Sequence, residues 1–136
     1  MTLALVALLS TIAVPSLISY WHASTLGAGA FELAGAISRA RQLAISLNAP
    51  VCVAVGGSTL RLERVSANAC TGVPFPGAGP VVLSLSSGLV VESAGPNIVF
   101  TSLGTATPGG SYTMVHPVTG ARRRVVVAAS GRVSVQ

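Results

Sequence analysis

The feature that most constrains this chain is an apolar stretch at its start, LALVALLSTIAVPSLISYW, from Leu3 to Trp21. No Arg, Lys, Asp or Glu occurs in residues 1–31. A transmembrane helix needs about 20 predominantly apolar residues, so the stretch is of marginal length for a span. Tyr20, Trp21 and His22 lie at its end, as aromatic residues do at a membrane–water boundary. No basic residue precedes Leu3, which counts against a complete classical signal peptide.

An amphipathic pattern continues the apolar stretch toward Pro50. Apolar residues recur at steps of four, three, four and three, which is one face of a helix, at Leu33, Ile37, Ala40, Ala44 and Leu47. Asn48 and Pro50 end the pattern, because the residue before a proline avoids the helical region. We therefore expect one long, bent helix from about Thr2 to Leu47, on the order of 70 Å in length.

Short runs rich in β-branched residues replace the helical pattern after Pro50. Glycine, proline and serine separate these runs, which is typical of short antiparallel strands. The expected fold class is α+β: a long N-terminal α-helix followed by a small antiparallel β-sandwich-like module, with no second long helix. Residues 1–22 are the apolar half of the helix, 23–48 its amphipathic half and 49–136 the β-module. Strands are expected at residues 51–55, 59–65, 81–85, 89–92, 97–101, 111–116, 122–128 and 132–135.

The composition indicates a chain that lies partly in lipid or is largely buried against partners. Only 8% of its residues are charged and 51% are hydrophobic, whereas a soluble domain carries about 25% charged residues. Mean hydropathy is +0.74. All eight basic residues are arginine, the acids are Glu32, Glu63 and Glu92, and the net charge is +5. This charge permits binding to phosphate or acidic lipid without requiring it.

The sequence offers little that supports catalysis. A general acid–base pair needs titratable groups that converge, whereas the three glutamates and two histidines are widely spread. His22 lies at the expected membrane boundary and His116 at a strand end, and both are interpreted as interfacial or surface side chains. The usual nucleophile, metal and phosphate-binding motifs do not occur. We therefore expect no enzymatic activity, no catalytic or metal-binding residues and no cofactor.

Cys52 and Cys70 are the two cysteines of the chain. If the apolar stretch crosses a membrane, both can lie on the oxidising side, where a disulfide persists. Closing the loop between them would contribute roughly 3 kcal/mol to stability. The alternative is a pair of free buried thiols, and the disulfide is the favoured interpretation.

One charged cluster stands out, GARRRVVV over residues 120–127. Side chains alternate across a strand, so Arg122 and Arg124 should share one face and Arg123 should lie on the other. Arg132, past a tight turn, is expected to return beside them. These four arginines either contact the phosphates of DNA or form a solvated edge that discourages aggregation. The second interpretation is favoured, because few aromatic residues accompany them.

Three stretches of the sequence together resemble one family. LALVALLSTIAVPSL resembles the N-terminal helix of type IV pilins, including an alanine-valine-proline just past its centre. LAGAISRARQLAISLNAPVCV resembles the GspH/FimT group of minor pilins and pseudopilins, where the helix ends and the first strand begins with a cysteine. TGARRRVVVAASGRVSV resembles the C-terminal hairpin of that group. The resemblance covers the start, the middle and the end of the chain, and it implies a pilin-like fold.

The resemblance implies that the opening helix is both an anchor and a building block. In such proteins it holds the subunit in the bacterial inner membrane as a single pass, with the β-module in the periplasm, and then packs with other helices in a filament. The implied partners are other pseudopilins or minor pilins, the inner membrane and, for the full-length precursor, prepilin peptidase. By alignment on Pro15, a basic leader and the first mature residues are expected to precede Met1. The residues implied to form the membrane and filament-core helix are Leu3, Leu5, Val6, Leu8, Leu9, Ile12, Val14, Pro15, Leu17 and Ile18.

Two functions follow from the resemblance. The first is a minor pseudopilin, a structural subunit of the type II secretion system pseudopilus that takes part in protein secretion across the outer membrane. The second is a FimT-like minor type IV pilin that binds DNA for natural transformation. The Gly-Arg-x-Arg signature of that subgroup is matched by Gly131 and Arg132, but Ser134 stands at the second arginine, so the first function is favoured. A membrane-anchored adhesin outside these machines is a third option.

Overall fold

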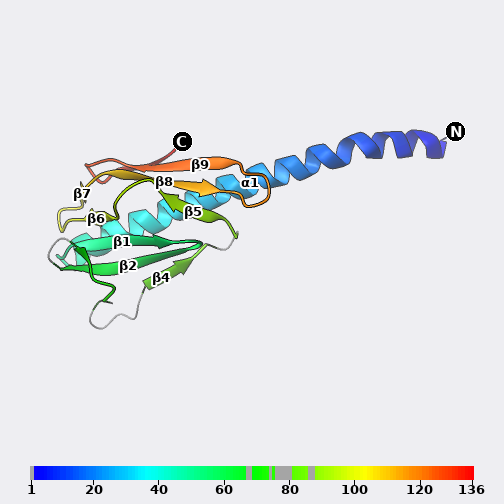
Figure 1. Cartoon of the computed structure of the whole chain (residues 1–136). Coiled ribbons are helices and arrows are strands. Elements are labelled where there is room, and N and C mark those ends of the chain that lie inside the picture. The colour runs from blue at the N-terminus through cyan, green and yellow to red at the C-terminus, as the bar shows by residue number, and fades with distance from the viewer. Residues whose placement is uncertain (1, 67–68, 74, 76–80, 86–87) are drawn as a thin grey trace.

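The computed structural model describes one long helix that carries two antiparallel sheets on its C-terminal half (Figure 1). The helix, α1 (Thr2–Ser46), projects its N-terminal half away from the sheets. This arrangement confirms the α+β fold predicted from the sequence. No second α-helix occurs in the part of the chain that the structure describes. The described residues are 2–66, 69–73, 75, 81–85 and 88–136.

The N-terminal half of α1 is a continuous helix that includes Pro15. A proline inside a helix removes one backbone donor and favours a local bend. The polar side chains of this half bond within the helix, as where Ser10 Oγ donates to Val6 O at 2.9 Å. Bonds of this kind lower the cost of placing a hydroxyl in an apolar environment. By length and composition, Ala4–Ser46 contains a segment able to cross a membrane, with a mean hydropathy of 1.7.

The C-terminal half of α1 buries one continuous face against the sheets. Its buried apolar residues recur at steps of four and three, at Leu26, Ala30, Leu33, Ile37, Ala40 and Ala44. The predicted face is confirmed from Leu33 to Ala44, but burial begins seven residues earlier, at Leu26. Leu47, which the periodicity placed on the same face, is exposed instead.

A Schellman motif at the end of α1 explains the exposure of Leu47. Asn48 has a positive φ of 47°, and its N–H donates to Ile45 O at 3.2 Å. The N–H of Ala49 donates to Ala44 O, also at 3.2 Å. These two bonds satisfy carbonyls that the helix end would otherwise leave open. The chain turns away before Leu47 completes another helical turn, so α1 ends one residue earlier than predicted.

Two antiparallel sheets make up the β-module, as predicted. The strands are β1 (Val51–Gly56), β2 (Thr59–Ser66), β3 (Ala69–Cys70), β4 (Val81–Ser84), β5 (Val90–Ser93), β6 (Ile98–Phe100), β7 (Ala106–Thr107), β8 (Gly110–Val115), β9 (Arg122–Val127) and β10 (Val133–Val135). The first sheet has the order β3-β2-β1-β6-β7, with β4 also paired to β2, and the second has the order β10-β9-β8-β5. The sequence did not reveal β3 and β7, because two residues are too few to show alternation.

Tyr112 connects the two sheets through the core. It lies on β8, its side chain is fully buried, and its hydroxyl donates to Val53 O on β1 at 3.2 Å. The same hydroxyl accepts the N–H of Ile98 on β6 at 3.4 Å. Burial raises the pKa of Tyr112 to about 12, and the bond from Ile98 opposes part of that rise. A neutral phenol therefore joins β8 of one sheet to β1 and β6 of the other.

The structure pairs Cys52 and Cys70 in a disulfide, as predicted. Their Cα atoms lie 5.7 Å apart, and 18 positions separate them in the sequence. Cys52 lies on β1 and Cys70 on β3, and both strands pair with β2. The bond thus ties β1 to β3, which contributes only two residues to the sheet.

The turn between β9 and β10 is pressed against the loop that precedes β7. Gly131 is buried with a φ of +82°, and a Cβ at this position would overlap the carbonyl oxygen of Gly104. Gly104 has a φ of +81°, and a Cβ there would lie 2.9 Å from Cδ1 of Ile45 near the end of α1. Only glycine fits both conformations without displacing a neighbour. This contact holds the C-terminal hairpin against the last turns of the helix.

Candidate functional site

The exposed N-terminal half of α1 is the first candidate functional surface. The apolar side chains expected there that the structure describes are all exposed: Leu5, Val6, Leu8, Leu9, Val14, Leu17 and Ile18. Pro15 is exposed as well, while the side chains of Leu3 and Ile12 lie outside the described part of the chain. A continuous apolar surface of this kind marks a protein or membrane interaction site.

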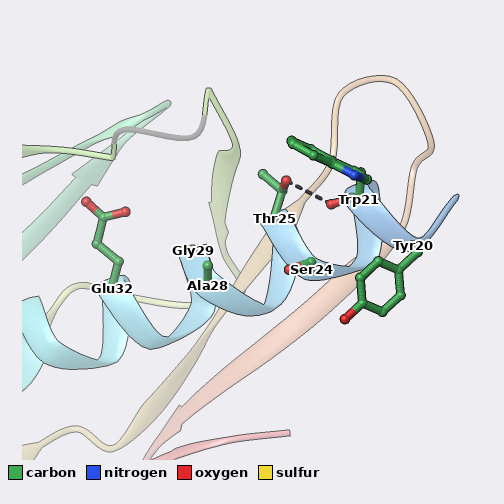
Figure 2. Close-up of a pocket in the computed structure, with 7 residues that line it drawn as sticks. All are labelled: Tyr20, Trp21, Ser24, Thr25, Ala28, Gly29 and Glu32. Atoms are coloured by element: carbon green, nitrogen blue, oxygen red, sulfur yellow. Dashed lines mark hydrogen bonds between the residues drawn. The ribbon is translucent and has the colours of Figure 1, made fainter. Parts of the chain in front are cut away.

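A shallow groove lies on α1 directly after this surface (Figure 2). Its volume is about 510 Å³, and all of its lining residues come from the helix: Tyr20, Trp21, Ser24, Thr25, Ala28, Gly29 and Glu32. The aromatic rings stand at one end and the carboxylate of Glu32 at the other, with small side chains between them. Thr25 Oγ1 donates to Trp21 O at 2.9 Å, so its hydroxyl is turned to the helix backbone. The groove therefore offers a contact surface with few reactive groups.

His116 differs from the surface histidine that the sequence predicts, because it is 7% exposed and bonded on both ring nitrogens. The backbone N–H groups of Val118 and Thr119 both donate to its Nδ1, each at 3.3 Å. This pattern assigns the proton of the neutral ring to Nε2. That nitrogen lies 3.1 Å from Nδ1 of His22 on α1, to which it donates. The turn between β8 and β9 is thereby attached to the helix one residue after Trp21.

Three arginines occupy the start of β9, directly after this turn. Arg122, Arg123 and Arg124 are all exposed, opposite Val115, Met114 and Thr113 of β8 respectively. The predicted alternation is supported by the burial of Val125 and Val127 further along the strand, which places Arg123 on the face turned to the core. The three side chains therefore fan out over both faces at one end of the sheet.

Arg132 does not join this cluster, contrary to the sequence prediction. The N–H of Ala128 donates to Arg132 O at 2.9 Å, and Gln136 is the residue that bonds Arg124. The hairpin runs back along β9, so Arg132, next to its turn, lies at the far end. Six positions at about 3.4 Å each separate Arg122 from Ala128, a distance of roughly 20 Å. The four arginines therefore form no continuous row.

The titratable groups of the described residues form no metal cluster: no three of His, Cys, Asp or Glu come together in the part of the chain that the structure describes. Both cysteines are bonded to each other. The surfaces found here are an apolar helix, a helix groove and an arginine cluster. Surfaces of these kinds interact with lipid, protein or phosphate through apolar contact and charge.

Sequence reasoning missed the contact between His22 and His116. They are 94 positions apart, and no local pattern connects residues at that separation. The available signal was that His116 follows a run of alternating strand residues and precedes Pro117, at a turn that must pass near the helix. That signal places a residue near α1 without identifying its partner.

Comparison with solved structures places the fold among minor pilins and pseudopilins. The type IV minor pilin FimU of Pseudomonas aeruginosa aligns with a TM-score of 0.65 at 16% identity, covering 86% of this chain and 92% of that chain. A second crystal form of FimU aligns with a TM-score of 0.60 at 18% identity, covering 82% and 92%. The minor pseudopilin EpsH from the type 2 secretion system of Vibrio cholerae aligns with a TM-score of 0.61 at 13% identity, covering 82% and 95%. At these identities the likeness shows the fold.

Sequence comparison identifies the family. A search of the curated proteins finds no match. The model of one protein family does match the chain, over residues 30–131. That range begins on the buried face of α1 and ends at Gly131 in the turn after β9, so it includes the first sheet and, of the second, every strand except β10. Since it spans well over half of the sequence, this chain belongs to the family described as type II transport protein GspH.

Proposed function

We propose that this chain is a minor pseudopilin, a structural subunit of the type II secretion system pseudopilus that takes part in protein secretion across the outer membrane. The observation that carries the proposal is the division of α1 near His22. Up to Trp21 its described apolar side chains are exposed, and from Leu26 one face is covered by the sheets. The helix can therefore exchange lipid for other helices without disturbing the β-module.

The exchange is physically reasonable, because a helix satisfies its own backbone hydrogen bonds in lipid and in a helical bundle alike. Small residues at Ala4, Ala7 and Ser10 allow another helix to approach closely. In this proposal α1 crosses the inner membrane once, the β-module lies in the periplasm, and the helix then packs among those of other pseudopilins. Prepilin peptidase processes the full-length precursor before assembly.

The alternative is a FimT-like minor type IV pilin that binds DNA for natural transformation. The observation that favours it is the exposure of Arg122, Arg123 and Arg124 at one end of β9. Two features weaken it. Arg132 lies near the opposite end of the hairpin, and Ser134 occupies the position where the subgroup has a second arginine.

Deleting the gene in its native bacterium and assaying both processes separates the two functions. The proposal expects secreted proteins to accumulate in the periplasm and DNA uptake to be unchanged. Complementation with the wild-type chain or with Leu9→Ile should restore secretion. Leu9→Arg should not, because an arginine at the centre of a span costs about 3 kcal/mol. Normal secretion together with lost DNA uptake would establish the alternative.

A further inference from the structure

We propose that the turn between β8 and β9, with the three arginines that follow it, rests on the anionic headgroups of the membrane that α1 crosses. The inference rests on the proposed function, because it requires α1 to be a membrane anchor. It assigns the cluster of Arg122, Arg123 and Arg124 to lipid phosphate.

The turn between β8 and β9 is held at a fixed position along the helix. His116 begins the turn, and its bond to His22 holds it one residue past Trp21. Tyr20 and Trp21 are exposed and form the boundary expected of a membrane-spanning helix. In Figure 1 the connection between β8 and β9 lies beside α1 on the side from which the N-terminal half projects. Inserting the helix up to this boundary therefore brings the turn to the level of the headgroups.

The tip of this turn exposes an apolar side chain. Val118 is two residues from His116, and its side chain is 79% exposed. The backbone N–H of Val118 donates inward to His116 Nδ1, so the turn is held while its apolar side chain stays in contact with solvent. Val90, which pairs with Val115 at the same end of the sheet, is also exposed. Apolar groups beside basic ones are the composition of a surface that lies on a membrane.

The three arginines lie close together beside the turn. Arg122 comes six residues after His116, and Arg124 lies only about 7 Å further along the strand. Because Arg122 pairs with Val115, next to His116 at the turn, and this spacing is shorter than the Debye length of about 8 Å at physiological salt, an anionic surface that meets the turn acts on all three charges. Each arginine near such a surface should strengthen its contact about fivefold. Glu92 on β5 pairs with Thr113 on β8, which in turn pairs with Arg124 on β9. The carboxylate of Glu92 therefore offsets part of the charge of Arg124.

The same cluster fits a lipid surface better than it fits DNA. A row of phosphate contacts along a duplex would need Arg132, which lies near the other end of the hairpin. Within residues 116–127 there is no Phe, Tyr or Trp on which a base could stack, and the ring of His116 is buried. The anchor itself keeps the cluster beside the membrane, so a weak contact is occupied at high effective concentration.

The test uses the full chain reconstituted into vesicles, with Val118→Cys carrying an environment-sensitive fluorophore. Cys52 and Cys70 are bonded to each other, so labelling is confined to the new thiol. Vesicles of phosphatidylcholine are compared with vesicles of phosphatidylcholine mixed with phosphatidylglycerol. Flotation on a density gradient reports the anchor independently of the fluorophore. We expect a blue shift of the emission in the anionic vesicles only, and its loss at high salt.

Two variants make the result specific. Replacing Arg122, Arg123 and Arg124 together by glutamine should abolish the shift and leave flotation unchanged. Arg132→Gln, a matched change near the far end of the hairpin, should behave as the wild type does. Emission that is the same in both kinds of vesicle, from protein that floats, overturns this inference and leaves the anchor intact. Protein that does not float overturns both.

A DNA arm distinguishes the competing partner. Duplex DNA is added to the labelled chain in phosphatidylcholine vesicles, where no anionic lipid competes. The inference expects no shift of the emission. A shift that DNA produces and the triple variant loses, with no response to phosphatidylglycerol, would assign the arginines to nucleic acid.

Discussion

Nε2 of His116 lies 3.1 Å from Nδ1 of His22, which joins a turn of the second sheet to α1 across 94 positions of sequence. The two rings meet edge to face, with centroids 4.6 Å apart. One ring nitrogen of His116 thus accepts from the turn while the other donates to the helix. This single side chain sets where the β8–β9 turn lies relative to the boundary of the apolar helix.

Replacing His116 should release the turn. His116→Ala removes the acceptor for two backbone N–H groups and the donor to His22, so the free energy of unfolding should fall by about 2 kcal/mol. His22→Ala should cost only about 1 kcal/mol, because the turn keeps its acceptor. Denaturant titration measures both, and amide hydrogen exchange at Val118 and Thr119 should accelerate only when His116 is changed. Unchanged exchange in His116→Ala would contradict this account of the turn.

Gly131 should tolerate no side chain. Gly131→Ala combines a positive φ with a Cβ that overlaps Gly104 O, so we expect a loss of about 3 kcal/mol or a failure to fold. Gly120→Ala is the matched control, since its φ is +68° and nothing lies within 4 Å of the added Cβ. The control should lose only about 1 kcal/mol. Equal losses in thermal denaturation would show that the contact with Gly104 does not limit this turn.

The disulfide should contribute substantially to the stability of the β-module. Replacing Cys52 and Cys70 together by alanine should lower the free energy of unfolding by roughly 3 kcal/mol, since the closed loop restricts the unfolded chain. Adding a reductant should destabilise the wild-type protein by a similar amount and leave the double variant unaffected. A variant that unfolds at the same denaturant concentration as the oxidised wild type would rule out this contribution.

Tyr112 should make the fold sensitive to alkali. Its pKa is raised from 10.0 to about 12 in the folded protein, so the unfolded chain loses this proton first. The raised pKa contributes about 2–3 kcal/mol to the free energy of unfolding. This contribution is complete below pH 10 and is lost as the pH rises toward 12. Tyr112→Phe should cost about 1 kcal/mol at neutral pH by removing the bonds to Val53 and Ile98.

The two proteins should then differ in their response to pH. Denaturant titrations between pH 9 and pH 12 should show a steeper loss of stability for the wild type than for Tyr112→Phe. Parallel losses would indicate that other groups control alkaline unfolding and that the hydroxyl of Tyr112 is accessible to water.

The helix and the strands were predictable because their signals are local. The spacing of Leu33, Ile37, Ala40 and Ala44 identifies a buried helix face without reference to any other part of the chain. The sequence pattern does not reveal that this face begins earlier, at Leu26 and Ala30, because Gly27 and Gly29 lie between these residues. Both glycines lower helix propensity, and tertiary packing overrides that preference.

The candidate site was less predictable because it depends on how distant segments meet. Three arginines in a row predict a charged strand, but only the register of the hairpin shows that Arg132 lies apart from them. The contact of His22 with His116 has no sequence signal of its own. Both results follow from the path of the chain around α1, which periodicity does not specify.

The most direct test of the central claim is site-specific photocrosslinking from Leu9, in the exposed apolar half of α1, in living cells. The account holds that this surface lies in the inner membrane and then packs against helices of other pilin-like subunits. It predicts adducts with the N-terminal helices of such subunits, identified by mass spectrometry and lost when the assembly ATPase is deleted. A chain that stays in the membrane and yields no pilin-like adduct from Leu9 would contradict it.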